Sequence, residues 1–407
     1  MAVKFFTNVI VTALQCVLIM IIITFFPGLP PDLKFEAFSI NPRPLYGVLE
    51  TNSKLNNAER LFEDEVKGPE DLAIYKGELY MTTHGGYVQK MTKNGDLLPV
   101  VKFGKPCEGI WQEHICGRPL GIHIDSNGIM HVADAYYGIK KVNLSSGEVE
   151  DLVDVTEKID GVAPMIPNAV DVSKTGDVYW TDSSISHKLN DGLFTLLGNG
   201  NGRLLMYNAK TKRSEVLLNG LHFSNGVLLS DDESYVIAAE TFKSRLIKYY
   251  IKGPQKGTSD VFIDDLPGFP DNLKRDANGN CVVSLILPTN LFYEYIVEIP
   301  LLRKFIARTL ALKQMLVKTV SNIYQHVLLD KLAHWIGHFE MLRITSAPRM
   351  TVIVLNKNGD IIESLHATDG KVAYLSSLVQ FNGFYYLGSP YNSYLGRVKI
   401  QKDKVKV

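Results

Sequence analysis

A short pattern recurs six times along this chain and constrains its fold more than any other feature. Each copy has a Pro or Ser, one or two polar residues, an alternating apolar stretch, and a turn rich in Gly, Asn and Asp. Adjacent copies start about fifty residues apart, a period typical of a solenoid, an array or a propeller. The copies are Gly68-Pro69-Glu70-Asp71-Leu72, Arg118-Pro119-Leu120-Gly121-Ile122, Ile166-Pro167-Asn168-Ala169-Val170, Phe223-Ser224-Asn225-Gly226-Val227, Phe269-Pro270-Asp271-Asn272-Leu273 and Tyr374-Leu375-Ser376-Ser377-Leu378-Val379.

The stretches that follow the turns have the chemistry of β-strands. They alternate β-branched and aromatic residues, as in Val178-Tyr179-Trp180-Thr181, and they lack helical periodicity. Six four-stranded blades around a channel fit residues 45–407, and radial closure would protect the sheet edges. The sequence therefore predicts an all-β fold, a six-bladed β-propeller; a stack of unrelated hairpins is the alternative.

Five oxygen-bearing side chains open four of the copies. If the blades surround an axis, these side chains meet at one point, where carboxylates and amide carbonyls can hold a hard divalent cation. Calcium takes six to eight oxygen ligands, whereas zinc and other transition metals prefer nitrogen and sulfur. We therefore predict one central Ca²⁺ ion, held by Glu70, Asn168, Asn225, Asp271 and Asn272.

The overall composition is that of a globular protein, with 46% hydrophobic and 21% charged residues. The 43 Lys and Arg residues balance the 43 Asp and Glu residues, so the totals carry no footprint of a nucleic-acid partner.

The N-terminus departs from this average. Val9 to Phe26 carries no charge and is long enough to cross most of a bilayer as a helix. Pro27-Gly28 then stops the helix, and no small-x-small cleavage site follows. We predict a short cytoplasmic N-terminus (1–8), a transmembrane signal anchor (9–26) and a linker (27–44); a cleaved signal peptide is the alternative. Either reading places the propeller in a lumen or outside the cell, and a retained anchor would make the chain a single-pass type II membrane protein.

Two further features agree with that compartment. Asn143-Leu144-Ser145 is an N-glycosylation acceptor just before a turn. Cys107 and Cys116 lie close together, whereas Cys16 is in the apolar segment and Cys281 in a strand pattern, so a Cys107–Cys116 disulfide is expected.

Residues 291–342 lose the turn rhythm and predict a helical insertion between blades five and six. Within it, residues 301–325 form a helix with many basic side chains and an apolar face of Leu301, Phe305, Leu312, Leu316, Val320 and Ile323. Three readings stay open. The helices add to the core, the basic helix lies on an anionic membrane surface, or the pair forms a lid that admits apolar substrates.

Several motifs resemble the strictosidine synthase-like family, in particular its membrane-anchored animal branch. They are Cys116-Gly117-Arg118-Pro119-Leu120-Gly121-Ile122, Val132-Ala133-Asp134-Ala135-Tyr136-Tyr137-Gly138, Asn168-Ala169-Val170-Asp171, Tyr179-Trp180-Thr181-Asp182-Ser183-Ser184, Phe223-Ser224-Asn225-Gly226-Val227 and Pro270-Asp271-Asn272. The resemblance implies a single-pass type II membrane glycoprotein with a six-bladed propeller and arylesterase activity. More distantly, the chain is similar to the paraoxonases and the regucalcin-like gluconolactonases. Their central calcium ligands map onto the five oxygen-bearing residues named above.

The chain departs from these relatives at catalytic positions. The first paraoxonase histidine corresponds to Leu120 and the second falls near Asp134, while the strictosidine synthase glutamate corresponds to Ser376. Neither a paraoxonase histidine pair nor alkaloid synthesis is therefore expected, and His123 is expected to be structural. A second, structural calcium ion would need an acid near Ala169, so although Asp71 is present, a second ion is not expected.

Two functions remain open from the sequence. The first is a calcium-dependent esterase or lactonase for small apolar substrates, with Glu70 or Asp271 acting as a base while also ligating, and His84 as an alternative base. The second is a membrane-tethered propeller that binds a protein or lipid and whose calcium is structural.

Overall fold

The computed structural model describes residues 2–344 and 349–400. Met1 and residues 345–348 and 401–407, which fall within the predicted N-terminus and propeller, lie outside the described residues. The chain forms two compact units. A helical unit comprises the residues up to Ser39, Asn190–Asn199 and Asn290–Met341, and a propeller unit comprises Ile40–Leu189, Gly200–Thr289 and the residues from Leu342 onward.

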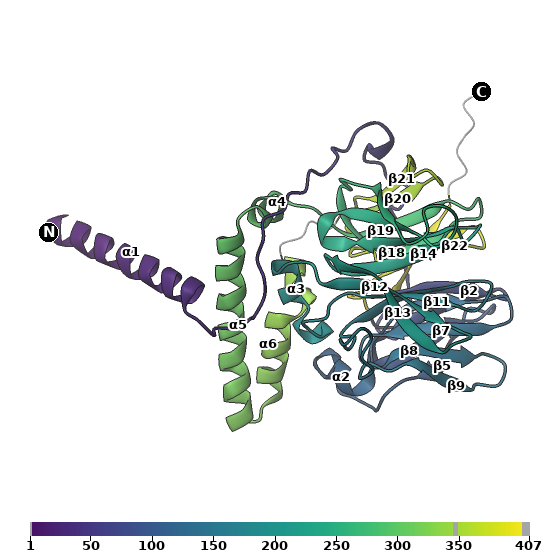
Figure 1. The fold of residues 1–407 in the computed structure, drawn as a ribbon, viewed down its shortest axis with the longest axis horizontal. Coiled ribbons are helices and arrows are strands. Elements are labelled where there is room, and N and C mark those ends of the chain that lie inside the picture. The colour runs from purple at the N-terminus through teal and green to yellow at the C-terminus, as the bar shows by residue number, and fades with distance from the viewer. Residues whose placement is uncertain (1, 345–348, 401–407) are drawn as a thin grey trace. The chain divides into compact units, whose positions relative to one another are not determined.

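The propeller unit contains six sheets of four antiparallel strands each, which confirms the predicted six-bladed propeller (Figure 1). Five sheets are built from strands in simple chain order. These are β2 (Leu72–Tyr75), β3 (Glu78–Thr83), β4 (Tyr87–Met91) and β5 (Leu97–Lys102) in blade one; β6 (Pro119–Ile124), β7 (Ile129–Asp134), β8 (Gly138–Asn143) and β9 (Val149–Val153) in blade two; β10 (Pro167–Val172), β11 (Val178–Asp182), β12 (Gly202–Asn208) and β13 (Arg213–Leu221) in blade three; β14 (Ser224–Leu229), β15 (Tyr235–Glu240), β16 (Arg245–Tyr250) and β17 (Ser259–Ile263) in blade four; and β18 (Gly268–Arg275), β19 (Cys281–Pro288), β20 (Met350–Leu355) and β21 (Ile361–Ala367) in blade five.

Blade six joins the two ends of the propeller. It contains β22 (Ser377–Phe381), β23 (Phe384–Gly388) and β24 (Leu395–Lys399), and its fourth strand is β1 (Glu59–Leu61), which pairs antiparallel with β24. Arg397 Nε also donates a hydrogen bond to Glu59 Oε2 at 2.9 Å. The ring is thus closed by a strand from the N-terminal side of the chain.

The first strand of each blade contacts the first strands of both neighbouring blades, so these six strands surround the axis. Glycines permit the close approach. A Cβ atom on Gly121 would lie 2.6 Å from Ala169 Cα, and one on Gly226 would lie 2.4 Å from the carbonyl oxygen of Asp271. Because real Cβ atoms are not found so close to backbone, the Gly in these two copies allows adjacent innermost strands to pack.

The helical insertion is confirmed, and strand pairing gives its position. The helices α4 (Leu291–Val297), α5 (Pro300–Ile323) and α6 (Val327–Gly337) lie between β19 and β20, which pair within blade five. The insertion is therefore inside blade five and not between blades five and six as predicted. The last two strands of that blade lack the motif that opens each repeat, so the pattern could not assign them to a blade.

The long helix α5 buries a different face from the apolar one expected. Its buried residues include Arg303, Ala307 and Ala311, whereas Leu316 and Ile323 are 64% and 82% exposed. Small side chains on the buried face allow close packing, and α5 and α6 lie side by side (Figure 1). The helical unit thus exposes a row of apolar side chains.

Helix α1 (Ala2–Phe25) contains the predicted anchor and begins earlier than expected, because no helix-breaking residue precedes Val9. Lys4–Phe25 contains an unburied 18-residue window with a mean hydropathy of 2.4 and is long and apolar enough to cross a membrane; Thr24, near its end, is buried. Arg308 of α5 donates hydrogen bonds to the carbonyl oxygens of Ile23, Thr24 and Phe26 at 3.1, 3.0 and 2.8 Å. These are the carbonyls left without helical partners at the end of α1.

The predicted disulfide between Cys107 and Cys116 is confirmed, with Cα atoms 5.5 Å apart. Asn143 ends β8 and is half-buried, and its Oδ1 accepts hydrogen bonds from the amides of Ser145 and Ser146 at 2.9 and 3.3 Å. Its glycosylation stays a prediction.

Candidate metal centre

The five predicted ligands lie on or beside the innermost strands. Glu70 precedes β2, Asn168 is in β10, Asn225 is in β14, and Asp271 and Asn272 are in β18. All five are at most 6% exposed. The Asn225 side chain donates a hydrogen bond to the Asp271 carboxylate, and the charge of Glu70 acts on Asp271. The structure therefore brings Glu70, Asn225 and Asp271 together.

Asn168 is connected to the same region through the hydroxyl of Ser183. Its Nδ2 donates to Ser183 Oγ at 2.9 Å, and Ser183 Oγ donates to the Ser224 carbonyl oxygen, next to Asn225, at 2.7 Å. The bond to Ser183 fixes the orientation of the Asn168 amide and leaves its oxygen as the available atom.

Three oxygens in this cluster are buried without a hydrogen-bond partner among the described residues. They are Asn168 Oδ1, Asn225 Oδ1 and Asp271 Oδ1. A buried acceptor without a partner costs about 1–3 kcal/mol, and native structures rarely leave several together. A cation would satisfy all three, so this donor set fits a hard divalent ion such as calcium.

Asn272 differs from the other four. Its unpartnered buried atom is Nδ2, which cannot ligate a cation. A ligand role for Asn272 requires its side-chain amide to turn over and present the oxygen.

The two carboxyl groups are strongly perturbed. Burial raises the pKa of Glu70 to about 7, with the Arg118 charge lowering it and the Asp71 charge adding to the rise. Burial, followed by the charges of Glu70 and Asp71, raises the pKa of Asp271 well above its usual range. Each carboxyl group makes ionisation of the other less favourable. An added positive charge between them would stabilise both ionised forms.

Arg118 is a residue of this site that sequence reasoning missed. It is 2% exposed, and its Nη2 donates to Glu70 Oε2 at 2.7 Å while its Nε lies 3.3 Å from Glu113 Oε1. The available signal was its place in the second copy, where an arginine stands two residues before Leu120. Arg118 holds one oxygen of Glu70 in place and adds a positive charge beside the predicted calcium ligands.

A lysine lies beside the acid considered for a second ion. Asp71 Oδ2 accepts hydrogen bonds from the Ile122 amide at 2.9 Å and from Lys274 Nζ at 2.8 Å, and its Oδ1 accepts one from the Leu72 amide. The ammonium of Lys274 thus supplies the positive charge that an ion would bring, and this donor set does not fit a second calcium ion.

The positions where relatives keep catalytic groups have structural roles here. Ser376 Oγ donates to the carbonyl oxygen of Glu70 at 2.7 Å, and Leu120 is 3% exposed. Asp134 Oδ1 accepts hydrogen bonds from the amides of Tyr136 and Tyr137 at 2.9 and 3.0 Å. Ser376 and Asp134 therefore support the backbone.

His84, the alternative base, and His123, which was expected to be structural, both lie beside polar groups. His84 Nε2 lies 2.8 Å from the carbonyl oxygen of Pro390. His123 Nδ1 lies 2.8 Å from Asp171 Oδ1, and burial followed by the charge of His123 lowers the pKa of the neighbouring His131 to about 4. His84 and His123 are thus held by neighbouring groups.

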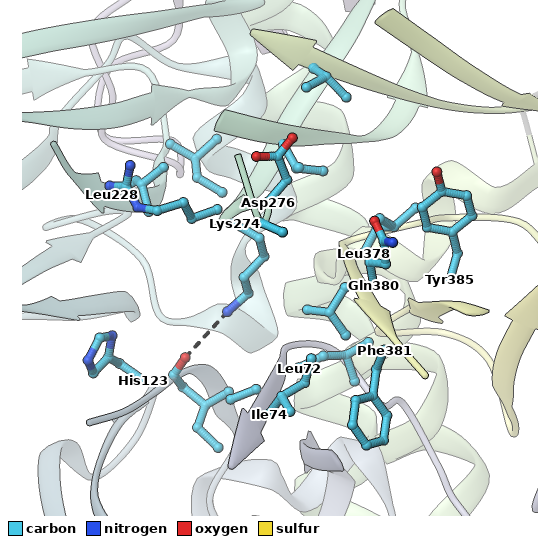
Figure 2. Close-up of a pocket in the computed structure, with 18 of the residues that line it drawn as sticks. Leu72, Ile74, His123, Leu228, Lys274, Asp276, Leu378, Gln380, Phe381 and Tyr385 are labelled. Carbon is cyan, nitrogen blue, oxygen red and sulfur yellow. Dashed lines mark hydrogen bonds between the residues drawn. The ribbon is translucent and has the colours of Figure 1, made fainter. Parts of the chain in front are cut away.

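A second feature of the channel is a pocket of about 780 Å³. Figure 2 shows Lys274 reaching into it, with His123 on one side and Phe381 and Tyr385 on the other. Its lining includes later residues of the innermost strands, such as Ile74 and Leu228, and none of the five oxygen-bearing residues. The pocket and the oxygen cluster therefore occupy different levels of the channel.

Comparisons with known proteins agree with this architecture. The strictosidine synthase family profile matches residues 168–254, and the profile of the strictosidine synthase-like N-terminal region matches residues 47–91. The structure is similar to a gluconolactonase from Xanthomonas campestris, with a TM-score of 0.53 and 11% identity over 92% of this chain and 99% of that one. It is also similar to a luciferin-regenerating enzyme, with a TM-score of 0.50 and 13% identity over 84% of this chain and 92% of that one. The fold is thus that of the lactonase-like six-bladed propellers.

Relatives that match over most of this chain show which family it belongs to. The adipocyte plasma membrane-associated protein Hemomucin of Drosophila melanogaster is 40% identical over 94% of this chain and 68% of its own length. The adipocyte plasma membrane-associated protein of Salmo salar is 34% identical over 98% of this chain and 91% of its own, and that of Homo sapiens is 34% identical over 90% and 84%. The chain belongs to the adipocyte plasma membrane-associated protein family, within the strictosidine synthase-like proteins.

Proposed function

We propose that this chain is a membrane-anchored, calcium-dependent hydrolase of small apolar esters or lactones. The observation that carries the proposal is the set of three bare, buried oxygens beside two carboxyls of raised pKa at the start of the innermost strands. Calcium held by Glu70, Asn168, Asn225 and Asp271, with Asn272 after an amide turn, would supply Lewis-acid polarisation of a substrate carbonyl.

Hydrogen bonds around the calcium position would hold the ligand side chains in place. Ser183 orients the Asn168 amide and Asn225 hydrogen-bonds Asp271, so neither donor needs to reorganise when a substrate arrives. Arg118 holds one carboxylate oxygen of Glu70 and leaves the other for proton exchange or ligation.

Glu70 is our first choice for the general base, and Asp271 the second. Burial raises the pKa of Glu70 to about 7 in the metal-free protein, and bound calcium would lower it, so the carboxylate would be ionised and able to accept a proton near neutral pH. Its role would be to accept a proton from the attacking water.

The experiment uses the full chain in detergent micelles, with phenyl acetate and a simple lactone as substrates. We expect turnover that EDTA abolishes and added calcium restores. Asp271→Asn should lose both calcium binding and turnover, whereas the matched control Asp260→Asn, an exposed acid of blade four, should keep both. Turnover that survives in Asp271→Asn would refute the metal mechanism.

A second function has one specific observation in its favour. Leu120 has no titratable group, and Ser376 is committed to the Glu70 carbonyl. A propeller with a structural calcium ion that binds a protein or lipid would need no base there. Calcium binding without turnover on any ester or lactone tested would favour this alternative.

We further propose that α1 is a type II anchor, with the propeller in a lumen or outside the cell. The disulfide supports this placement because such bonds persist in oxidising compartments.

We also propose that the helical unit contacts the membrane through apolar side chains. Arg303 is fully buried and donates to the carbonyl oxygens of Leu197 and Gly198, and Arg308 holds the end of α1, so these two basic residues are not available to anionic lipids. The exposed Leu316, Ile323 and Trp335 remain for apolar contact. Brominated lipids in nanodiscs should quench a fluorescence component that Trp335→Phe removes; identical quenching in that variant would refute the contact.

A further inference from the structure

Three potential metal ligands gather at the end of α6, in the helical unit. His334 is in α6, His338 caps its C-terminus, and Glu340 follows in the 3-10 helix Phe339–Ile344. Residues four apart lie on the same face of a helix, so the two imidazoles meet one above the other. One ligand atom from each of the three residues lies within 4.8 Å of the others.

His334 is buried with both ring nitrogens lacking a hydrogen-bond partner within residues 2–344 and 349–400. Its exposed fraction is 7%, so water does not replace the missing partners. Leaving such polar atoms buried and unbonded costs about 1–3 kcal/mol each. A bound ion or molecule would give the ring nitrogens of His334 the partner that they lack.

His338 and Glu340 lie beside His334 and could bind the same ion. The His338 ring is 5% exposed and stacks on the His334 ring with centroids 4.4 Å apart, and Glu340 Oε2 lies 3.9 Å from His334 Nε2. Glu340 is bonded locally, since its amide donates to His338 Nδ1 at 3.3 Å. Two imidazoles and a carboxylate thus face one small volume.

The end of α6 is held firmly against α5. Gln314 Nε2 donates to the carbonyl oxygen of Ala333 at 3.0 Å and to Asp191 Oδ1 at 2.6 Å. A Cβ atom on Gly337 would lie 2.3 Å from the same Nε2, so the glycine allows the helix to pack there. Asp191 also accepts from Lys318 at 3.2 Å, which commits this acid to neighbours and leaves the three residues as the ligand set.

We propose that His334, His338 and Glu340 bind a divalent transition metal, with Zn²⁺ as the best fit. Imidazole nitrogens with one carboxylate suit zinc, whereas calcium prefers the all-oxygen set of the propeller. Three protein ligands leave a fourth position for water or another group. The metal would tie the end of α6 to the 3-10 helix that follows it.

The test uses the full chain in detergent micelles, stripped of metal and then saturated with Ca²⁺ so that the propeller site is occupied. Zn²⁺ alone is titrated by calorimetry, and retained zinc is measured after desalting. We expect one tightly bound zinc ion per chain and a higher melting temperature. Asp271→Asn should bind zinc as the wild type does, because its change lies in the propeller.

Variants decide whether these residues are the ligands. His338→Ala should abolish stoichiometric binding, and Glu340→Gln, which changes a partly exposed side chain, should weaken it at least about tenfold. His326→Gln removes an exposed imidazole from the start of the same helix and should bind zinc normally. Circular dichroism checks that each variant is folded.

Cobalt gives a readout that a purely structural role of the histidines would not produce. Co²⁺ in the wild type should show the visible d–d bands of a tetrahedral nitrogen and oxygen site, and these bands should be absent in His338→Ala. A wild-type chain that retains no zinc after desalting would overturn the proposal. So would wild-type zinc affinity in folded Glu340→Gln and His338→Ala.

Discussion

The ammonium of Lys274 lies 2.8 Å from the carboxylate of Asp71, although 203 positions separate the two residues in the chain. Asp71 stands at the start of blade one and Lys274 in the first strand of blade five. The pair connects two non-adjacent blades across the channel.

Lys274→Met should destabilise the propeller. Removing the lysine leaves the Asp71 carboxylate, whose side chain is 4% exposed, without its positive partner, at a cost of about 3 kcal/mol. The double variant Asp71→Asn/Lys274→Met should recover part of that loss in chemical denaturation. Lys252→Met, which breaks an exposed pair with Glu233, serves as the control and should change stability by less than about 1 kcal/mol. Equal effects of both lysine variants would contradict the buried role of Lys274.

Gly226→Ala should weaken calcium binding at least about tenfold, because its Cβ atom would lie 2.4 Å from the Asp271 carbonyl oxygen and push that strand outward. The control is Gly396→Ala in blade six, where the added atom would lie 2.9 Å from Leu387 Cβ and its three nearest atoms all belong to Leu387, which is not a predicted ligand. Both variants should lose stability in thermal unfolding, but only Gly226→Ala should lose calcium affinity by calorimetry. Unchanged affinity in a folded Gly226→Ala would argue against Asp271 as a ligand.

Calcium affinity should rise with pH across neutrality. Binding needs ionised carboxylates, and the free protein holds a proton on Glu70 below its pKa of about 7. Calcium must displace that proton below pH 7, and the raised pKa of Asp271 adds proton competition in the same direction, so affinity increases between about pH 6 and about pH 8. Calorimetry in buffers of different ionisation enthalpy should detect proton release at the lower pH. In Glu70→Gln the pH dependence over this range should be reduced; a pH-independent wild type would exclude Glu70 from the site.

Arg308→Ala should loosen the segment that follows α1. The guanidinium donates to the carbonyl oxygens of Ile23, Thr24 and Phe26, and losing such charge-assisted bonds should speed local opening about tenfold or more. Limited proteolysis at residues 27–39 measures this opening. The exposed Lys313→Ala on the same helix should be cleaved as slowly as the wild type, and equal cleavage of all three proteins would show that Arg308 does not restrain the anchor.

Reduction of the Cys107–Cys116 disulfide should lower the melting temperature by several degrees, since closing this short loop is worth about 2–3 kcal/mol. The bond closes the loop that contains Glu113, so its loss should also loosen the acid beside Arg118. Cys16→Ser should melt at the wild-type temperature before reduction and lose as many degrees on reduction, because Cys16 is a free thiol in α1 and the disulfide is intact in this variant. A reductant-insensitive melting temperature would contradict this prediction.

The sequence predicted the propeller because each copy combines an opening polar residue with a turn, and these are local signals. It failed to place the insertion because β20 and β21 lack the opening polar residue, although a turn at Asn356–Asp360 joins them, so only pairing with β19 assigns them to blade five. The apolar residues of α5 do recur at helical spacing, but the helix buries Arg303 and its alanines instead. Arg303 is buried because it donates to a neighbouring carbonyl oxygen, and the alanines are buried because small side chains let helices pack closely.

Some residues of the candidate site could be predicted from the sequence and others could not. Glu70, Asn225 and Asp271 could be predicted from their equivalent positions in the repeats, and the structure brings them together. Arg118 and Lys274 could not, because their partners, Glu70 and Asp71, come from other blades and a repeat pattern does not reveal contacts between unlike positions. The His334, His338 and Glu340 cluster lies outside the repeats altogether.

The pairing of β1 with β24 sets an order of events for biosynthesis. Residues 59–61 are made early, soon after the anchor, yet their partner strand is made more than three hundred residues later. Blades one to five can each form as their strands emerge, but the ring stays open, with its last edge unpaired, until residues 395–399 have appeared. A ribosome that stops short of this strand would leave a chain with an exposed sheet edge, which quality-control factors can recognise as unfinished.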